Sequence, residues 1–206
     1  MKRIEIHPVN PQPRLIRQVA EQFQTGALVA LPTDASYVLA CHLEDRTAVD
    51  RMRQLRGIDE KHLLTLLCRD LSELSQYAQV DNRQFRFLKE WTPGAYTFIL
   101  PATREVPRRL MHPSRKTVGL RVPEAPIVQA LLAELGVPLL CASLILPGDE
   151  DPLSDPDDIQ DRIGKRIDLL VDGGAGQLGA TSVIDVTGDE PVIQRVGMGP
   201  VEAMLR

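Results

Sequence analysis

Short apolar runs alternate with longer amphipathic segments along the whole chain, a pattern typical of an α/β fold. Residues 27–31 and 37–41 are apolar at every position, and each run has the length of a buried strand. Residues 126–135 instead carry apolar side chains at 127, 128, 131, 132 and 135, the spacing of one helix face. The alternation therefore predicts strands and helices that are interleaved to the end of the sequence.

The same reasoning assigns an element to most of the chain. We expect strands at residues 3–6, 27–31, 37–41, 63–68, 96–100, 117–122, 139–143, 168–171, 182–186 and 192–195. We expect helices at residues 10–24, 45–55, 81–91, 126–135 and 156–163, and a short one after Asp70. Asn10 and Ser154 are the expected N-caps of the first and last of these helices.

This order of elements predicts a single α/β domain over residues 1–206, with a twisted mixed sheet and flanking helices. The last strands follow one another without helices, so some of the pairing should be antiparallel. No apolar run approaches the roughly 20 residues that span a bilayer, and the N-terminus lacks the apolar region of a secretory signal. We therefore expect a cytoplasmic protein that does not enter a membrane.

The three cysteines give no sign of a metal centre. Cys41, Cys68 and Cys141 are widely spaced, form no CxxC pair, and lie in apolar runs. Buried thiols are the expected outcome, and no metal ligand set is predicted.

Charge is unevenly distributed along a chain whose formal net charge is −4. Residues 104–121 are rich in basic side chains, whereas residues 149–161 carry seven acidic residues and no basic one. A solvated face explains either run, and a basic stripe also suits nucleic-acid binding. The basic residues of interest are Arg104, Arg108, Arg109, Arg115 and Lys116.

Polar residues follow several apolar strands, where α/β proteins bind ligands. Pro32-Thr33-Asp34 follows the strand at 27–31 and is either an ordinary turn or a ligand-binding loop. Arg56 closes a helix, where a cation is favourable without any ligand and where it also suits a carboxylate or phosphate. Ser143 ends a strand, but no histidine stands in a persuasive relation to it, so a Ser–His hydrolase is not supported.

A glycine-rich segment at 173–179 follows the strand at 168–171. It is neither a Walker A loop nor a dinucleotide fingerprint, because no Gly-Lys-Ser/Thr and no helix follow it. A plain turn and a loop beside a ligand are equally compatible with it. Thr181 and Ser182, which come next, are suited to donate hydrogen bonds to phosphate.

Taken together, these sequence segments resemble those of the YrdC/YciO family. Pro32-Thr33-Asp34 with Tyr37 looks like the family's Pro-Thr-Asp-Thr-x-Tyr motif, and Val118-Gly119-Leu120-Arg121-Val122-Pro123 like its Val-Gly-Leu-Arg-Val-Pro phrase. Trp91 to Thr97, Pro138 to Gly148, Asp172-Gly173-Gly174, and Thr181 to Asp185 with Arg195 resemble further segments in the right order. The sequences at residues 68–75 and 106–110 are most similar to the YciO branch of the family.

The resemblance implies a YrdC-like fold with a concave cleft. It also implies a protein similar to the threonylcarbamoyl-AMP synthases, which use ATP, threonine and bicarbonate and serve the modification of tRNA. Mg²⁺ would then arrive with ATP, no prosthetic group is expected, and double-stranded RNA or tRNA is a possible partner. The residues implied for substrate and nucleotide are Thr33, Arg56, Arg121, Ser143, Ser182 and Arg195, with Arg56 as the catalytic group.

Three departures from the family pattern affect the chemistry expected there. Gln54 stands where the family has the lysine of Lys-x-Arg, Ile145 where it has the asparagine of Ser-Ala-Asn, and Ala35 where it has a second threonine. An ammonium and an amide contribute charge-assisted bonds worth about 1.5–3 kcal/mol each. We therefore expect weak or altered synthase activity, and the alternative is a non-catalytic protein that binds double-stranded RNA through the basic stripe.

Overall fold

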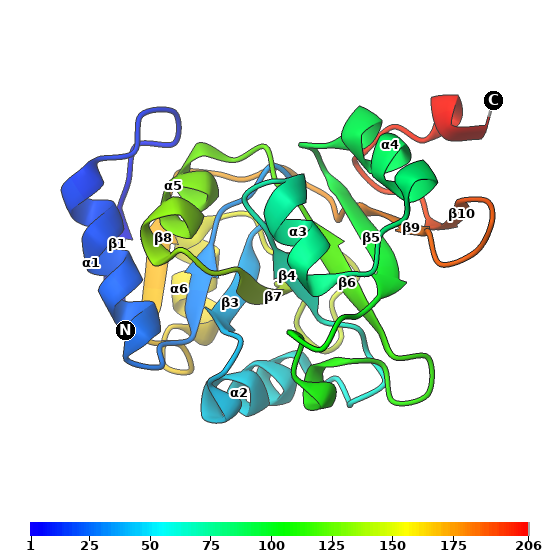
Figure 1. Cartoon of the computed structure of the whole chain (residues 1–206). Helices are drawn as coiled ribbons and strands as arrows, with labels where there is room; N and C mark the ends of the chain where they lie inside the picture. The colour runs from blue at the N-terminus through cyan, green and yellow to red at the C-terminus, as the bar shows by residue number, and fades with distance from the viewer. Residues whose placement is uncertain (206) are drawn as a thin grey trace.

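The chain folds into one ten-stranded mixed sheet flanked by six α-helices, as a computed structural model describing residues 1–205 shows (Figure 1). The strands are β1 (Lys2–Glu5), β2 (Val29–Leu31), β3 (Val38–His42), β4 (Thr65–Leu67), β5 (Tyr96–Pro101), β6 (Thr117–Arg121), β7 (Leu139–Ser143), β8 (Leu169–Asp172), β9 (Ser182–Asp185) and β10 (Val192–Arg195). The helices are α1 (Pro13–Gln24), α2 (Arg46–Arg56), α3 (Leu71–Tyr77), α4 (Asn82–Trp91), α5 (Pro126–Leu135) and α6 (Pro156–Ile163). Two 3₁₀ turns, η1 (Arg108–Leu110) and η2 (Glu202–Leu205), complete the described elements.

The strand order brings distant parts of the sequence together. The order is β1-β8-β2-β3-β7-β4-β6-β5-β9-β10. β9 and β10 pair antiparallel, which confirms the expectation for the end of the chain, whereas β9 joins β5 in parallel. The strands at residues 139–143, 65–67, 117–121, 96–101 and 182–185 therefore lie next to one another, as the fifth to ninth strands of the sheet.

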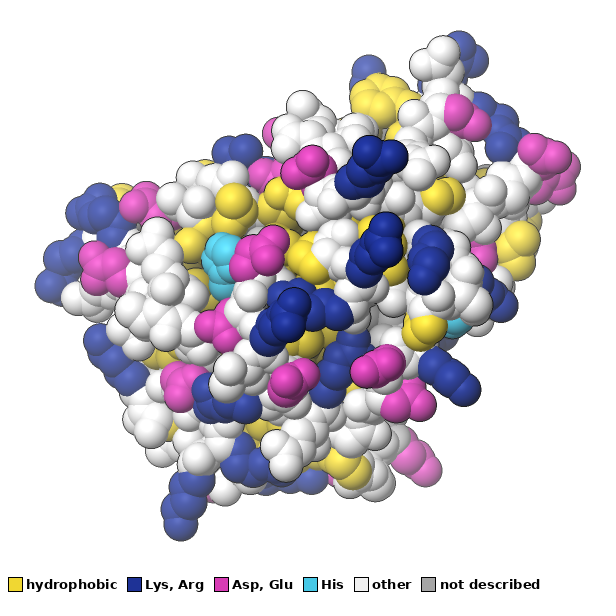
Figure 2. All heavy atoms as spheres, turned by 60° about the horizontal axis from the view of Figure 1, so that its bottom comes forward, with side chains coloured by type: hydrophobic (Ala, Val, Ile, Leu, Met, Phe, Trp, Pro, Cys, Tyr) yellow, Lys and Arg dark blue, Asp and Glu magenta, His cyan; other side chains and the backbone are white. Residues whose placement is uncertain are grey.

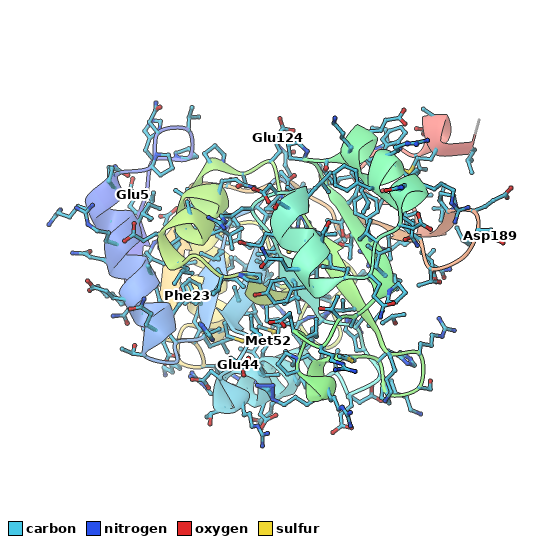
Figure 3. The ribbon with its side chains drawn as sticks, viewed as in Figure 1. Glu5, Phe23, Glu44, Met52, Glu124 and Asp189 are labelled. Carbon is cyan, nitrogen blue, oxygen red and sulfur yellow. The ribbon has the colours of Figure 1, made fainter. Side chains whose placement is uncertain are left out.

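Two apolar clusters hold the helices on the sheet. α1 and α5 pack together and bury Ile16, Val19, Val128 and Leu131 against one of these clusters. The larger cluster receives buried side chains from α2, α3, α4 and α6. Figure 3 shows Phe23 of α1 and Met52 of α2 directed into the body of the molecule, where both are buried.

Two helix caps differ from those expected. α1 begins at Pro13, not near Asn10, because Pro13 takes the first helical position and Gln12 precedes it without a capping side chain. The main-chain N–H of Asn10 instead donates to Nδ1 of His7. At α6 the cap is Asp155 rather than Ser154, since Pro156 opens the helix and the Asp155 carboxylate accepts the N–H groups of residues 157 and 158.

Candidate functional site

A cavity of about 190 Å³ lies across six neighbouring strands, from β7 through β4, β6, β5 and β9 to β10. Its walls come from these strands and from the segment that follows α2. The lining residues are Arg56, His62, Leu63, Thr65, Thr97, Ile99, Gly119, Ala142, Ser143, Ile145, Thr181, Val183 and Arg195. Three residues expected to hold a nucleotide, namely Arg56, Ser143 and Arg195, thus line one cavity.

Arg56 reaches the cavity from the last turn of α2. Gly57, in the left-handed conformation at φ 65°, ends the helix directly after it. One guanidinium nitrogen donates to the Ile145 carbonyl at 3.0 Å, whereas the buried Nε has no partner among residues 1–205. Burial, together with the charge of Arg195, lowers the pKa of Arg56, but arginine stays protonated in proteins. Arg56 is therefore a cation with unused donor capacity.

Arg195 supplies a second cation from the opposite side, at the end of the edge strand β10. Its guanidinium donates to the Thr181 carbonyl at 3.1 and 2.8 Å, which fixes its direction. The side chain is exposed at the cavity rim, yet the surrounding protein lowers its pKa through desolvation. Arg56 and Arg195 thus place two positive charges on one cavity.

The floor between the two arginines carries hydroxyl groups. Thr65, Thr97 and Thr181 come from β4, β5 and the start of β9, and the Thr97 and Thr181 hydroxyls lie 2.8 Å apart. Gly119 keeps this floor open, because a Cβ there would lie 2.9 Å from Thr65 Oγ1 and 3.3 Å from the Leu64 carbonyl oxygen. The floor therefore offers neutral hydrogen-bonding groups beneath the two cations.

Among residues 1–205 no carboxylate lines this cavity, although Asp and Glu are more numerous in the chain than Lys and Arg. His62 is the third basic side chain of the lining; the residue is exposed, but partial desolvation together with the charges of Arg56 and Arg53 lowers the pKa of its imidazole. Two arginines, an imidazole and several hydroxyls without a counter-charge form a set of donors suited to an anion such as phosphate or carboxylate.

Thr33 and Arg121 lie outside this cavity. Arg121 is buried at the end of β6, where it pairs with Asp34 and donates to Thr33 Oγ1 at 3.1 Å. The second Asp34 oxygen accepts the Glu124 N–H at 2.9 Å. Arg121 therefore holds the loop at 32–36 in place, and Thr33 lines a separate cavity of about 150 Å³ beside the glycine-rich loop and the start of α5.

Ser182 is fully buried and does not line the cavity. Its hydroxyl donates to the Gly199 carbonyl at 2.5 Å and accepts the Gly197 N–H at 2.8 Å, so it fastens the C-terminal segment. Its neighbour Thr181 faces the cavity instead, since successive side chains of a strand point to opposite faces. Sequence reasoning missed Thr65, Thr97 and His62, although a threonine within an apolar strand was a usable signal for the first two.

The three departures from the family pattern have different structural outcomes. Gln54 is exposed on α2 and is not among the cavity-lining residues, whereas Ile145 lines the cavity beside Arg56. Ala35 is buried in the loop at 32–36. The cavity therefore gains an apolar wall at Ile145, in the place where the resemblance leads us to expect an amide.

Three residues of the basic stripe, Arg104, Arg108 and Lys116, line a third cavity of about 620 Å³ together with uncharged residues. Arg115 is also exposed, whereas Arg109 donates to the Leu43 carbonyl at 3.0 Å and so ties η1 to the segment before α2. Figure 2 turns the bottom of Figure 1 forward and shows Lys and Arg gathered in places between acidic side chains on this face. The stripe is a set of exposed cations with one structural arginine among them.

Residues 1–205 contain no group of three or more His, Cys, Asp or Glu side chains placed to hold a metal ion. No helix in this part of the chain has the length and apolar character to cross a membrane. All three cysteines are free and buried, as the sequence predicted.

Comparison with known sequences places the chain in a family. The Sua5/YciO/YrdC family profile, which carries the description telomere recombination, matches residues 21–197, and the chain belongs to this family. It is 52% identical over 200 residues to YciO of Escherichia coli K12, an uncharacterized protein, with 97% of each chain covered. The threonylcarbamoyl-AMP synthase of Vibrio vulnificus is more distant, at 28% identity over 166 residues, 79% of this chain and 88% of that protein.

Solved structures give the same relation. The crystal structure of E. coli YciO matches with a TM-score of 0.96 and 50% identity, covering 99% of this chain and 100% of that one. P. abyssi Sua5 complexed with L-threonine matches with a TM-score of 0.89 and 26% identity, covering 99% of this chain and 60% of the Sua5 chain. The chain thus has a YciO-like fold and a distant relation to the threonylcarbamoyl-AMP synthases.

Proposed function

We propose that this protein binds a nucleotide such as ATP or AMP in the cavity between Arg56 and Arg195. The observation that carries the proposal is a cavity lined by two arginines and several hydroxyls, to which the described part of the chain contributes no carboxylate. Among residues 1–205 the Arg56 guanidinium has the Ile145 carbonyl as its one hydrogen-bond partner, and a cavity-lining cation with free donors favours an anionic ligand. In this arrangement Arg56 and Arg195 receive the phosphate oxygens, while Ser143 and Thr181 bind neighbouring polar groups.

The reaction we propose resembles that of the threonylcarbamoyl-AMP synthases, with ATP, threonine and bicarbonate as substrates and pyrophosphate as a product. Arg56 would be the catalytic group, because a fixed cation stabilises the negative charge on the phosphate oxygens as the adenylyl group is transferred and pyrophosphate leaves. Mg²⁺ would arrive bound to ATP. The apolar side chain of Ile145 at the cavity wall supports a rate below that of a site with an amide there, or a different acceptor in place of threonine.

Pyrophosphate release from ATP, threonine and bicarbonate tests the reaction. We expect slow release of pyrophosphate that depends on threonine or on another amino acid. Arg56→Ala should lower its rate by about ten- to hundredfold, because the variant loses one charge-assisted hydrogen bond. Arg46→Ala is the matched control, because Arg46 is exposed on the same helix and does not line the cavity. Release that is equal in both variants, or absent at high enzyme concentration, would refute the synthase proposal.

A second candidate function is non-catalytic binding of double-stranded RNA or tRNA. Arg104, Arg108 and Lys116 line the 620 Å³ cavity, whose other lining residues among 1–205 are uncharged, although the exposed Glu105 follows Arg104 in the sequence. Arg115 is exposed close by in the sequence. Arg109 should contribute less to RNA binding than these residues, because its guanidinium donates to the Leu43 carbonyl.

Binding of tRNA or a short RNA duplex at several salt concentrations tests this second function. We expect affinity to fall steeply with salt and Arg104→Glu with Arg108→Glu to abolish it, because phosphate contacts release counterions. Arg14→Glu with Arg17→Glu makes the same change of charge on exposed positions of α1 and should leave most of the affinity. Binding that is insensitive to salt, or equally weakened by both pairs, would contradict the proposal.

A further inference from the structure

His62 differs from the other three histidines in how its ring is used. In His7, His42 and His112 the ring Nδ1 accepts a main-chain N–H from a residue two or three positions later. Within residues 1–205 the His62 ring makes no hydrogen bond, and only its main-chain N–H is engaged, to the Asp59 carbonyl at 3.3 Å. The imidazole lines the mouth of the cavity with both nitrogens free.

The charges that face His62 come mostly from cations. Arg53 and Arg56 act from α2 and Arg195 acts from β10, while Asp59, in the same loop, is the one acidic group that opposes them. Burial and these arginines lower the pKa of His62, so its neutral form is favoured when the cavity holds no anion. A dianion between Arg56 and Arg195 would reverse this balance, because an opposite charge nearby favours the protonated imidazole.

We propose that His62 is a third anion ligand whose protonation is coupled to anion binding in the cavity, so that the phosphate group of a ligand is bound together with a proton. This inference rests on the proposed function, since it assumes that the cavity receives an anion. It deepens that function by naming His62 as the residue that selects a dianionic group over a monoanionic one.

The sign of the coupling follows from linkage. His62 binds a proton more tightly in the complex than in the free protein, so anion affinity is highest at low pH and falls as the pH rises. The fall reaches about tenfold per pH unit between the free and the bound pKa values and vanishes outside that interval. The free pKa lies below the ordinary value of 6.5, so the interval begins below pH 6.5.

Sulfate is the appropriate probe, because it stays dianionic across this range whereas phosphate itself titrates there. Calorimetric titration of the full chain with sulfate at pH values from about 5.5 to 7.5 should show affinity that falls with pH. His62→Gln keeps a neutral hydrogen-bonding side chain and should remove most of this dependence. An equal dependence in wild type and His62→Gln would overturn the proposal.

Proton NMR measures the pKa of His62 directly, with and without sulfate, and so tests the coupling in the wild-type protein. The pKa of His62 should rise by about one unit or more at saturating sulfate. A His62 pKa that stays unchanged at saturation would overturn the coupling but leave the anion site intact. Absence of sulfate binding at every pH would instead remove both the coupling and the anion site of the proposed function.

Discussion

Removing Arg121 should destabilise the fold strongly, because its charge is buried opposite that of Asp34. The two side chains are 4% and 13% exposed, and the Asp34 carboxylate also accepts the Glu124 N–H. Taking away one partner of a buried pair leaves an uncompensated charge and typically costs about 3–5 kcal/mol. Arg121→Met keeps most of the apolar stem and therefore most of its packing. The free energy of unfolding should then fall by about 3–5 kcal/mol because the Asp34 carboxylate is left without its partner.

Urea unfolding followed by circular dichroism measures this change, with m-values confirming that the same transition is compared. Arg121→Met with Asp34→Asn should be less destabilised than the sum of the single variants, since the orphaned charge is gone. Arg83→Met is the control, because the Arg83–Asp189 pair is 3.9 Å apart and exposed on both sides, and it should change stability little. An Arg121→Met protein as stable as Arg83→Met would refute the view that this pair anchors the loop at 32–36.

Three further results are expected. Gly119→Ala should weaken nucleotide binding by about tenfold, because its Cβ would lie 2.9 Å from a hydroxyl of the cavity floor; equal ATP affinity in wild type and variant would contradict this use of the floor. Ser182→Ala should lower the free energy of unfolding by about 1–3 kcal/mol, since the Gly197 N–H loses its acceptor, yet leave ATP affinity unchanged. The buried thiols should react with iodoacetamide at pH 8 far more slowly in the folded than in the urea-unfolded protein, because burial raises the pKa of Cys41 and of Cys141 to about 12; fast labelling of the folded protein would contradict their burial.

The sequence predicted the elements well because strands and helices differ in length and in hydrophobic period. Residues 139–143 and 156–163, for example, were expected and are observed as β7 and α6. The caps of α1 and α6 were less predictable, since a polar residue and a proline compete for the same few positions. In both helices the proline takes the first turn and decides which residue becomes the cap.

The candidate site was predictable only where a motif marked it. Arg56, Ser143 and Arg195 lie far apart in the sequence, and the pairing of β9 with β5 is what brings the last of them to the cavity. Local pattern does not say which strands are neighbours, and it does not distinguish the inward Ser182 from the cavity-facing Thr181. His62 belongs to no motif, and only the fold shows that it lines the same cavity as Arg56 and Arg195.

Calorimetric titration of ATP into wild type, Arg56→Ala and Arg46→Ala most directly tests the claim that the cavity between Arg56 and Arg195 binds the phosphates of a nucleotide. We predict measurable binding in wild type, unchanged affinity in Arg46→Ala, and a loss of about ten- to hundredfold in Arg56→Ala, the value of one charge-assisted hydrogen bond. Equal affinity of the three proteins for ATP, or no binding by any of them, would contradict the account.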